Sequence, residues 1–249
     1  MTDRNPGAHR VLVPVEILRG EAVPDAIIET FASVPIVLLG YHELPDQTVP
    51  SQARNQFEGK AQAELDDLVS AIEAAGGDVT TRLVFTHDAM KTFERVAVEL
   101  ECDSILLLNP APVLERVLVP VRGDVNVRHI GRLVGYVVAD TDVAVTLLHV
   151  TREERGQKEG HELLTDVRDQ LEATGVSRGR VSSTVVVSDS PRPEILAAAD
   201  DHDLVVLGED RPSARDVIFG DMSTVVAERA VCPVLVVRKR YLKADDTTA

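Results

Sequence analysis

The chain has 249 residues, of which 44% are hydrophobic and 27% are charged, a composition typical of one large or two modest folded domains. Its formal net charge of −15 argues against non-specific nucleic-acid binding, because the phosphate backbone repels an acidic surface. No apolar run reaches the roughly 18 residues of a membrane span, and the first ten residues lack the apolar stretch of a signal peptide. We therefore expect a cytoplasmic protein without a membrane span.

Lysine is scarce among the charged residues, with 5 Lys against 21 Arg, 22 Asp and 19 Glu. An acid-rich, Lys-poor surface suits high intracellular salt, where charges are screened over a few Å, so we predict a halophilic source. The alternative is an acidic mesophilic protein. Cys102 and Cys232 lie far apart in apolar stretches, which predicts two buried thiols rather than a disulfide or a metal site.

In the first half, apolar runs predict four strands, at residues 10–15, 35–41, 79–86 and 104–108. A helix is predicted at 55–76 from an apolar stripe spaced by three and four residues. Its members are Phe57, Ala61, Leu65, Leu68 and Ile72.

The second half repeats the first. "RVLVPVE" at 10–16 returns as "RVLVPVR" at 116–122. Leu163, Leu164, Val167 and Leu171 are spaced for one helix face, and "PEILAAADDHD" predicts another helix with Pro193 in its first turn. Further strands are predicted at 144–150, 181–189, 204–208 and 232–238.

This alternation predicts an α/β protein with two doubly wound parallel-sheet domains. The first, at 1–113, is truncated, because it has no room for a last helix and a fifth strand. The second, at 114–240, is complete, and 241–249 form a flexible tail. Strand 104–108 is expected to be an exposed edge, which the other domain or a second chain covers.

The stretches "RVLVPV", "SDSPRPEILAAADDHDLVVLG" and "FGDMSTVVAERAVCPVLVVR" resemble the universal stress protein family. The second half is similar over about 116–238, the first over about 10–108. The resemblance implies a tandem member with flavodoxin-like domains of strand order 3-2-1-4-5. It also implies a ligand site beyond the carboxyl ends of the strands, at the topological switch point.

In the nucleotide-binding branch of that family, the pattern is G-x-x-G, nine residues, then G-[S/T], with an Asp after the first strand. Gly208 and Gly220 match the outer glycines here. Arg211 replaces the middle glycine, Asp221 replaces the hydroxyl residue, and Arg122 stands where the Asp belongs. The resemblance therefore places the candidate nucleotide or anion site at Pro120, Val121, Arg122, Gly208, Arg211, Gly220, Asp221, Met222 and Ser223.

These departures change the chemistry of the site. Asp221 at a helix start can bond the free N–H groups itself, taking the role of a phosphate. A phosphate about 4 Å from that carboxylate meets roughly 1 to 4 kcal/mol of repulsion. We therefore interpret the site as degenerate. The alternatives are an anion or adenine-nucleotide site rebuilt from Arg122, Arg211 and Arg215, with ATP as the ligand, and a site for an unrelated ligand.

Other motifs give no catalytic assignment. The seven histidines lack metal-site spacing; His42 and His149 are interpreted as half-exposed strand-end residues that could line the site. Asp88, and Asp189 or Ser190, are interpreted as helix caps. There is no G-x-S-x-G elbow and no P-loop motif.

The first hypothesis for function is thus a non-catalytic regulatory or binding module of the stress response, needing no cofactor. It is expected to act as a homodimer through strand 232–238, and through a protein partner. The rival arrangement pairs that strand with the open edge of the first repeat. The alternative function is a nucleotide sensor that uses the 208–223 loop; a third is the cytosolic part of a transport system.

Overall fold

A computed structural model describes residues 9–123, 127–208, 226–227 and 229–238. The chain divides into two compact units, here called the first unit (Pro6–Leu108) and the second unit (Asn109–Ala249). Within the described part, no helix combines the length and the apolar character that a membrane crossing requires.

The first unit is a parallel sheet of four strands in the order β3-β2-β1-β4. Its elements, in chain order, are β1 (Val11–Glu16), η2 (Ile17–Arg19), α1 (Asp25–Phe31), β2 (Ile36–Glu43), α2 (Pro50–Ala74), β3 (Val79–Thr86), α3 (Ala89–Glu99) and β4 (Ser104–Leu107). As predicted, the described part of this unit ends without a last helix and a fifth strand.

The second unit is a parallel sheet in the order β7-β6-β5-β8-β9, which is the predicted 3-2-1-4-5 order. Its described elements are β5 (Arg116–Pro120), α4 (Val127–Val138), β6 (Ala144–Thr151), η3 (Glu154–Gly156), α5 (Gln157–Ala173), η4 (Arg178–Arg180), β7 (Val181–Val187), α6 (Pro191–Ala199), β8 (Leu204–Gly208) and β9 (Val234–Val237). The predicted α/β class and topology are confirmed.

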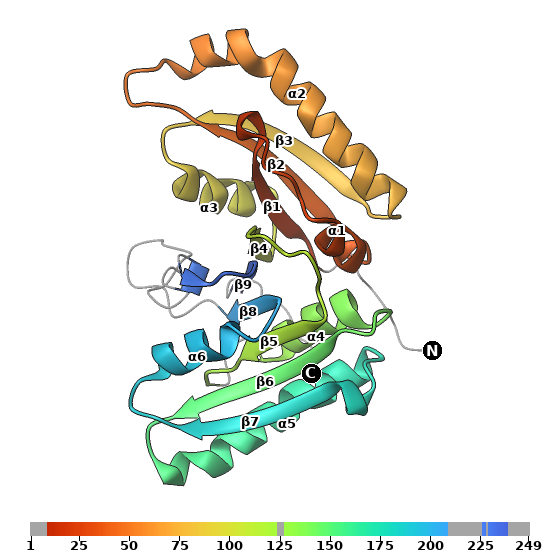
Figure 1. The fold of residues 1–249 in the computed structure, drawn as a ribbon, viewed down its shortest axis with the longest axis vertical. Helices are drawn as coiled ribbons and strands as arrows, with labels where there is room; N and C mark the ends of the chain where they lie inside the picture. Colours follow the sequence, from red (N-terminus) through yellow and green to blue (C-terminus); the bar gives the residue numbers. More distant parts are fainter. Residues whose placement is uncertain (1–8, 124–126, 209–225, 228, 239–249) are drawn as a thin grey trace, which may run out of the picture. The chain divides into compact units, whose positions relative to one another are not determined.

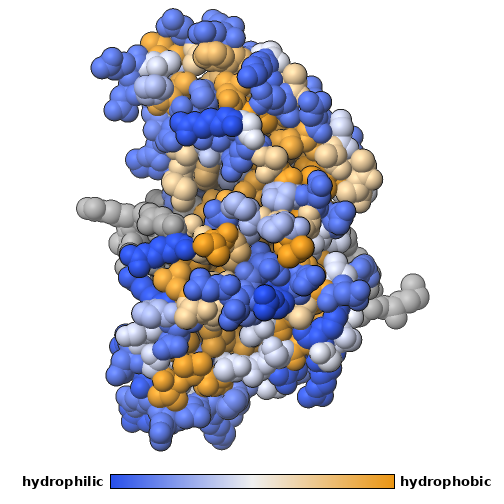
Figure 2. Space-filling view, in the orientation of Figure 1, coloured by the Kyte–Doolittle hydropathy of each residue, from blue (hydrophilic) through white to orange (hydrophobic). Residues whose placement is uncertain are grey.

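Helices cover both faces of each sheet, so the central strands are buried (Figure 1). In the first unit α2 and α3 lie on opposite faces, and in the second unit α5 and α6 do. Strands β1 and β8 are accordingly apolar, whereas β3, at the edge of its sheet, is only partly buried. The outer side of α2 is mostly hydrophilic (Figure 2).

Both units anchor their first strand with the same device. Asp103, before β4, accepts the N–H of Arg10 at 3.0 Å, and its own N–H donates to the Arg10 carbonyl. Asp203, before β8, does the same for Arg116, at 2.9 Å. In the first unit the buried His9 Nδ1 also lies 2.6 Å from Asp103 Oδ2. This repeated contact supports the tandem interpretation at the level of structure.

The second unit has an unusually close helix contact between α4 and α5. A Cβ on Gly135 would lie 2.0 Å from Oγ1 and 2.8 Å from Cβ of Thr174, and one on Gly131 would lie 2.7 Å from Cβ of Gln170. Thr174 is buried and its hydroxyl donates to the Leu171 carbonyl at 2.7 Å. Glycine is therefore required at these positions by packing.

One packing contact is inverted between the two units. Gly40 pairs with Val15 on the neighbouring strand, and Leu65 of α2 lies over it; a Cβ there would be 3.2 Å from Leu65 Cδ1. His149, one residue beyond the Pro120–Leu148 pair, occupies the equivalent position in the second sheet. Its ring lies under Gly160 of α5, where a Cβ would be 2.5 Å from Cδ2.

Element ends differ from prediction where capping decides them. Helix α2 begins at Pro50, ahead of the predicted 55, because proline suits the first helical position. It ends at Ala74, because Gly76 adopts a φ of +85°. Asp88 is confirmed as a cap, accepting the Lys91 N–H at 3.0 Å. Ser190 occupies the N-cap position of α6 but makes no side-chain cap bond, so that interpretation is wrong for Ser190.

Candidate functional site

Four residues of the predicted site lie in the described part of the chain: Pro120, Val121, Arg122 and Gly208. The others, Arg211, Gly220, Asp221, Met222 and Ser223, lie outside the described residues, as does Arg215. The structure therefore describes the part of the site that lies at the ends of β5 and β8.

Strands β5 and β8 meet at the switch point of the second sheet. They pair in parallel, with Val117 opposite Leu204 and Leu118 opposite Val205, so their carboxyl ends come out at the same edge. Pro120 is the last residue of β5, and Arg122 beyond it is exposed. Adjacent parallel strands whose crossovers run in opposite directions leave a ligand position at this edge.

The backbone after β5 is held from the side of β6. The Val121 N–H donates to the Leu148 carbonyl at 2.7 Å, and Nδ1 of His149 lies 2.8 Å from the Val121 carbonyl oxygen. Since that oxygen only accepts, His149 must carry its proton on Nδ1. Gly123 then turns the chain, with a φ of +65°. His149 thus positions the residue directly before Arg122, a role that a strand-end pattern alone does not reveal.

Gly208 has a packing reason to be glycine. A Cβ there would lie 3.0 Å from Cδ1 of Ile130, a buried residue of α4. Gly208 does not adopt a positive φ. Close approach of α4, rather than a left-handed turn, accounts for the absence of a side chain at this position.

The equivalent edge of the first sheet has the opposite charge. Val11 pairs with Ser104 as Val117 pairs with Leu204, so Glu16 is the counterpart of Arg122, and Leu108 that of Gly208. Glu16 is only 9% exposed. Its Oε1 lies 3.0 Å from Arg19 Nε and 3.8 Å from His42 Nδ1.

Glu21 completes this edge. One of its carboxylate oxygens accepts the Glu16 N–H at 2.5 Å. Burial raises the pKa of Glu21, the Glu16 hydrogen bond opposes that shift, and the Glu16 charge adds to it. Burial and the carboxylates of Glu21, Glu16 and Glu43 likewise raise the pKa of Tyr41. An anion is therefore disfavoured at this edge.

A model of the universal stress protein family matches residues 113–238, which are 126 of the 249 residues. The chain belongs to the universal stress protein family. The match covers β5 to β9, so it includes both strand ends that form the described part of the candidate site.

Solved universal stress protein structures resemble the chain over its length. One from Archaeoglobus fulgidus DSM 4304 covers 93% of this chain and 97% of its own, with a TM-score of 0.65 and 15% identity. A putative one from Pseudomonas aeruginosa UCBPP-PA14 covers 93% and 94%, with a TM-score of 0.56 and 14% identity. These likenesses concern the fold. No curated protein matches the chain.

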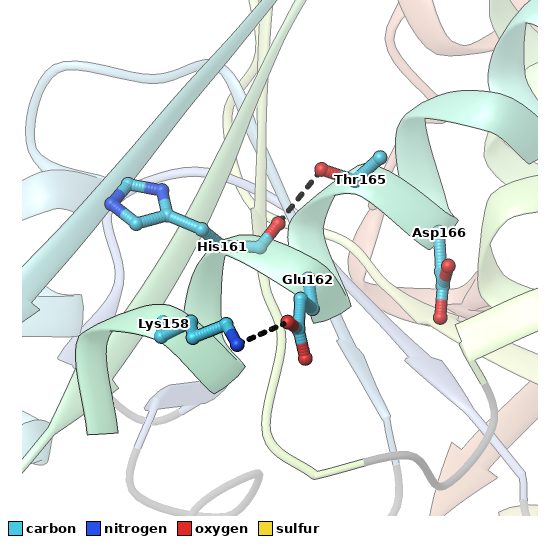
Figure 3. Close-up of a pocket in the computed structure, with 5 residues that line it drawn as sticks. All are labelled: Lys158, His161, Glu162, Thr165 and Asp166. Carbon is cyan, nitrogen blue, oxygen red and sulfur yellow. Dashed lines mark hydrogen bonds and ion pairs between the residues drawn. The ribbon is translucent and has the colours of Figure 1, made fainter. Parts of the chain in front are cut away.

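A surface hollow of this universal stress protein lies away from the switch point. It is lined by Lys158, His161, Glu162, Thr165 and Asp166, all of α5 (Figure 3). Lys158 and Glu162 form an ion pair at 3.8 Å, and the Thr165 hydroxyl donates to the His161 carbonyl at 2.8 Å. Contacts within one exposed helix account for this arrangement, so we assign it no function.

The two thiols are buried, as predicted. Burial is the main cause that raises the pKa of Cys232, so this thiol stays protonated and unreactive at neutral pH.

Proposed function

We propose that this universal stress protein is a cytoplasmic, non-catalytic regulatory module of the stress response, with a degenerate nucleotide site in its second unit. The observation that carries the proposal is the close approach of Ile130 to Gly208, because it gives this glycine a packing role that needs no ligand. In the sequence, Arg122 stands where the pattern of the nucleotide-binding branch has Asp. Asp221 stands where that pattern has a hydroxyl residue. Both substitutions change the charge that a nucleotide would meet.

The test is calorimetric titration with Mg-ATP, at low and at molar KCl, on protein freed of ligand by unfolding and refolding. We expect no heat and no thermal stabilisation. The Asp221→Ser variant removes a carboxylate whose repulsion is roughly 1 to 4 kcal/mol, equal to about one to three decades of affinity. It is therefore expected to bind more tightly than the parent.

Micromolar binding by the parent would instead favour the alternative, an adenine-nucleotide sensor that uses the 208–223 loop. In that case Arg211→Ala and Arg122→Ala should weaken binding, because each removes a cation that can hold phosphate. Arg178→Ala is the matched control, since Arg178 is 77% exposed and pairs with Glu172. Equal loss in the control would refute the site assignment.

We also propose that the chain forms a homodimer through strand 232–238. Within the second unit, the described strand β9 pairs with β8, and the proposal is that a strand of a second copy pairs along its other edge. The rival arrangement joins β9 to β4 of the same chain. Light scattering across a KCl series distinguishes them: a dimer supports the proposal, and a monomer at every salt concentration refutes it. The series also tests the proposed halophilic origin, which predicts greater stability at high salt.

A further inference from the structure

The carboxyl edge of the first sheet holds two buried polar atoms without a hydrogen-bond partner among the described residues. They are Oε1 of Glu16, at the end of β1, and Nδ1 of His42, near the end of β2. They lie 3.8 Å apart, about 1 Å beyond the length of an N–H···O hydrogen bond. A small side-chain movement would therefore join them.

The carboxylate has a competing cation on its outer side. Arg19 Nε lies 3.0 Å from the same Oε1, but the Arg19 side chain is 68% exposed, whereas that of His42 is 21% exposed. An ion pair with an exposed partner is weak, because water and salt screen it. A charged imidazole on the buried side would compete for Oε1 effectively.

Charged groups also act on Tyr41, the residue directly before His42. These groups are the carboxylates of Glu21, Glu16 and Glu43 and the guanidinium of Arg19. Burial is the main cause that raises the pKa of the Tyr41 phenol, and the three carboxylates add to that shift.

Two apolar rings also lie beside His42 among the described residues. Phe57 of α2 and Phe85 of β3 each lie 6.2 Å from the imidazole centroid, with their planes steeply inclined to it. Nδ1 of His42 is buried, and neither phenyl ring carries a charge. A proton on Nδ1 therefore has Glu16 as its nearest acceptor.

We propose that Glu16 and His42 form a proton-operated latch, in which His42, once protonated from solvent, donates Nδ1–H to Glu16 Oε1 and displaces Arg19. The movement is transmitted to residues 17–24, which join β1 to α1, because Arg19 lies in this segment and Glu21 holds the Glu16 N–H. Acidification then rearranges the segment that begins at the carboxyl edge of β1. The latch is independent of the proposed nucleotide site.

The experiment is an NMR titration of the full chain between about pH 4.5 and pH 8. It follows the His42 ring protons, the Arg19 Nε–H and the backbone N–H groups of residues 17–23. We expect all three to change together, with one midpoint. His42→Gln should abolish the shared transition, and Glu16→Gln should uncouple the segment from the ring. His87→Gln is the matched control, since His87 bonds the Leu44 carbonyl.

An exposed-site variant keeps the test decisive if a buried variant does not fold. Arg19→Met removes both the competitor and a nearby positive charge, so the shared midpoint should move to higher pH, by about half a unit. The proposal is overturned if residues 17–24 do not respond to pH in the parent. It is equally overturned if their response persists in His42→Gln or is unmoved in Arg19→Met.

Discussion

The guanidinium of Arg180 is predicted to hold the carboxyl end of α4 in place. Its Nη1 donates to the carbonyls of Val138, at 3.0 Å, of Val143, at 3.2 Å, and of Thr141, and its Nη2 to that of Ala139, at 3.3 Å. The last carbonyls of a helix have no partner inside it, and a cation there also complements the helix dipole. One side chain thus contacts four carbonyl oxygens, and the Val138 carbonyl also accepts from the Thr141 hydroxyl at 2.9 Å.

The expected change in unfolding free energy follows from the hydrogen bonds that Arg180→Met removes. Hydrogen bonds from a charged donor are worth about 1.5 to 3 kcal/mol each. Arg180 is half-buried, so water replaces part of that set, and the four bonds share one side chain. We therefore expect a loss of about 2 to 4 kcal/mol in the unfolding free energy of the second unit, rather than the sum.

The assay is urea unfolding combined with hydrogen exchange, because two units need not unfold in one transition. Amides at the end of α4 should lose protection in Arg180→Met. Arg178→Met is the control, two residues away and 77% exposed; it should change stability by less than about 0.5 kcal/mol. If the two variants are equally stable, the carbonyl cluster does not depend on Arg180.

Three further outcomes are expected. Gly135→Ala should destabilise the second unit by about 2 kcal/mol, because the added Cβ would overlap Thr174. Gly179→Ala is the control and should not destabilise the unit in this way, because the space around Gly179 is open. Equal melting temperatures of the two variants would contradict the packing argument. Glu21 has a raised folded-state pKa, so its contribution to stability is present at acid pH and is lost as pH rises through that pKa. Glu21→Gln should therefore be more stable than the parent at pH 8 and not at pH 4; a pH-independent difference in urea midpoint would refute this. Asp88→Ala should cost about 1 kcal/mol by loss of the cap of α3, and an unchanged thermal midpoint would refute it.

The repeat and the alternation of strands and helices were enough to predict the topology, because parallel crossovers leave few arrangements. Strand ends were less predictable. Strand β2 runs to Glu43, beyond the predicted 41, because its pairing with β3 continues to Thr86 even after the apolar pattern has stopped. How far a strand stays paired with its neighbour cannot be predicted from the sequence of that strand alone.

The candidate sites, too, could be predicted only in part from the sequence. A motif located Arg122 and Gly208 at the ends of their strands. It did not show that Ile130 fills the space beside Gly208, because that contact needs the position of α4. Nor did it bring Glu16 and His42 within 3.8 Å, which depends on the register between β1 and β2.

The inverted contact at Gly40 and His149 bears on how a tandem chain avoids misfolding. Two similar halves on one chain invite a helix of one half to dock on the sheet of the other. Here the bulk lies on the helix in the first unit, as Leu65, and on the strand in the second, as His149. The strand residues Gly40 and His149 differ greatly in volume, so a helix that packs closely against one of them does not fit the other equally well. Overpacking costs about 1 to 3 kcal/mol, so this difference between the two sheets favours the docking of each helix on its own half of the chain.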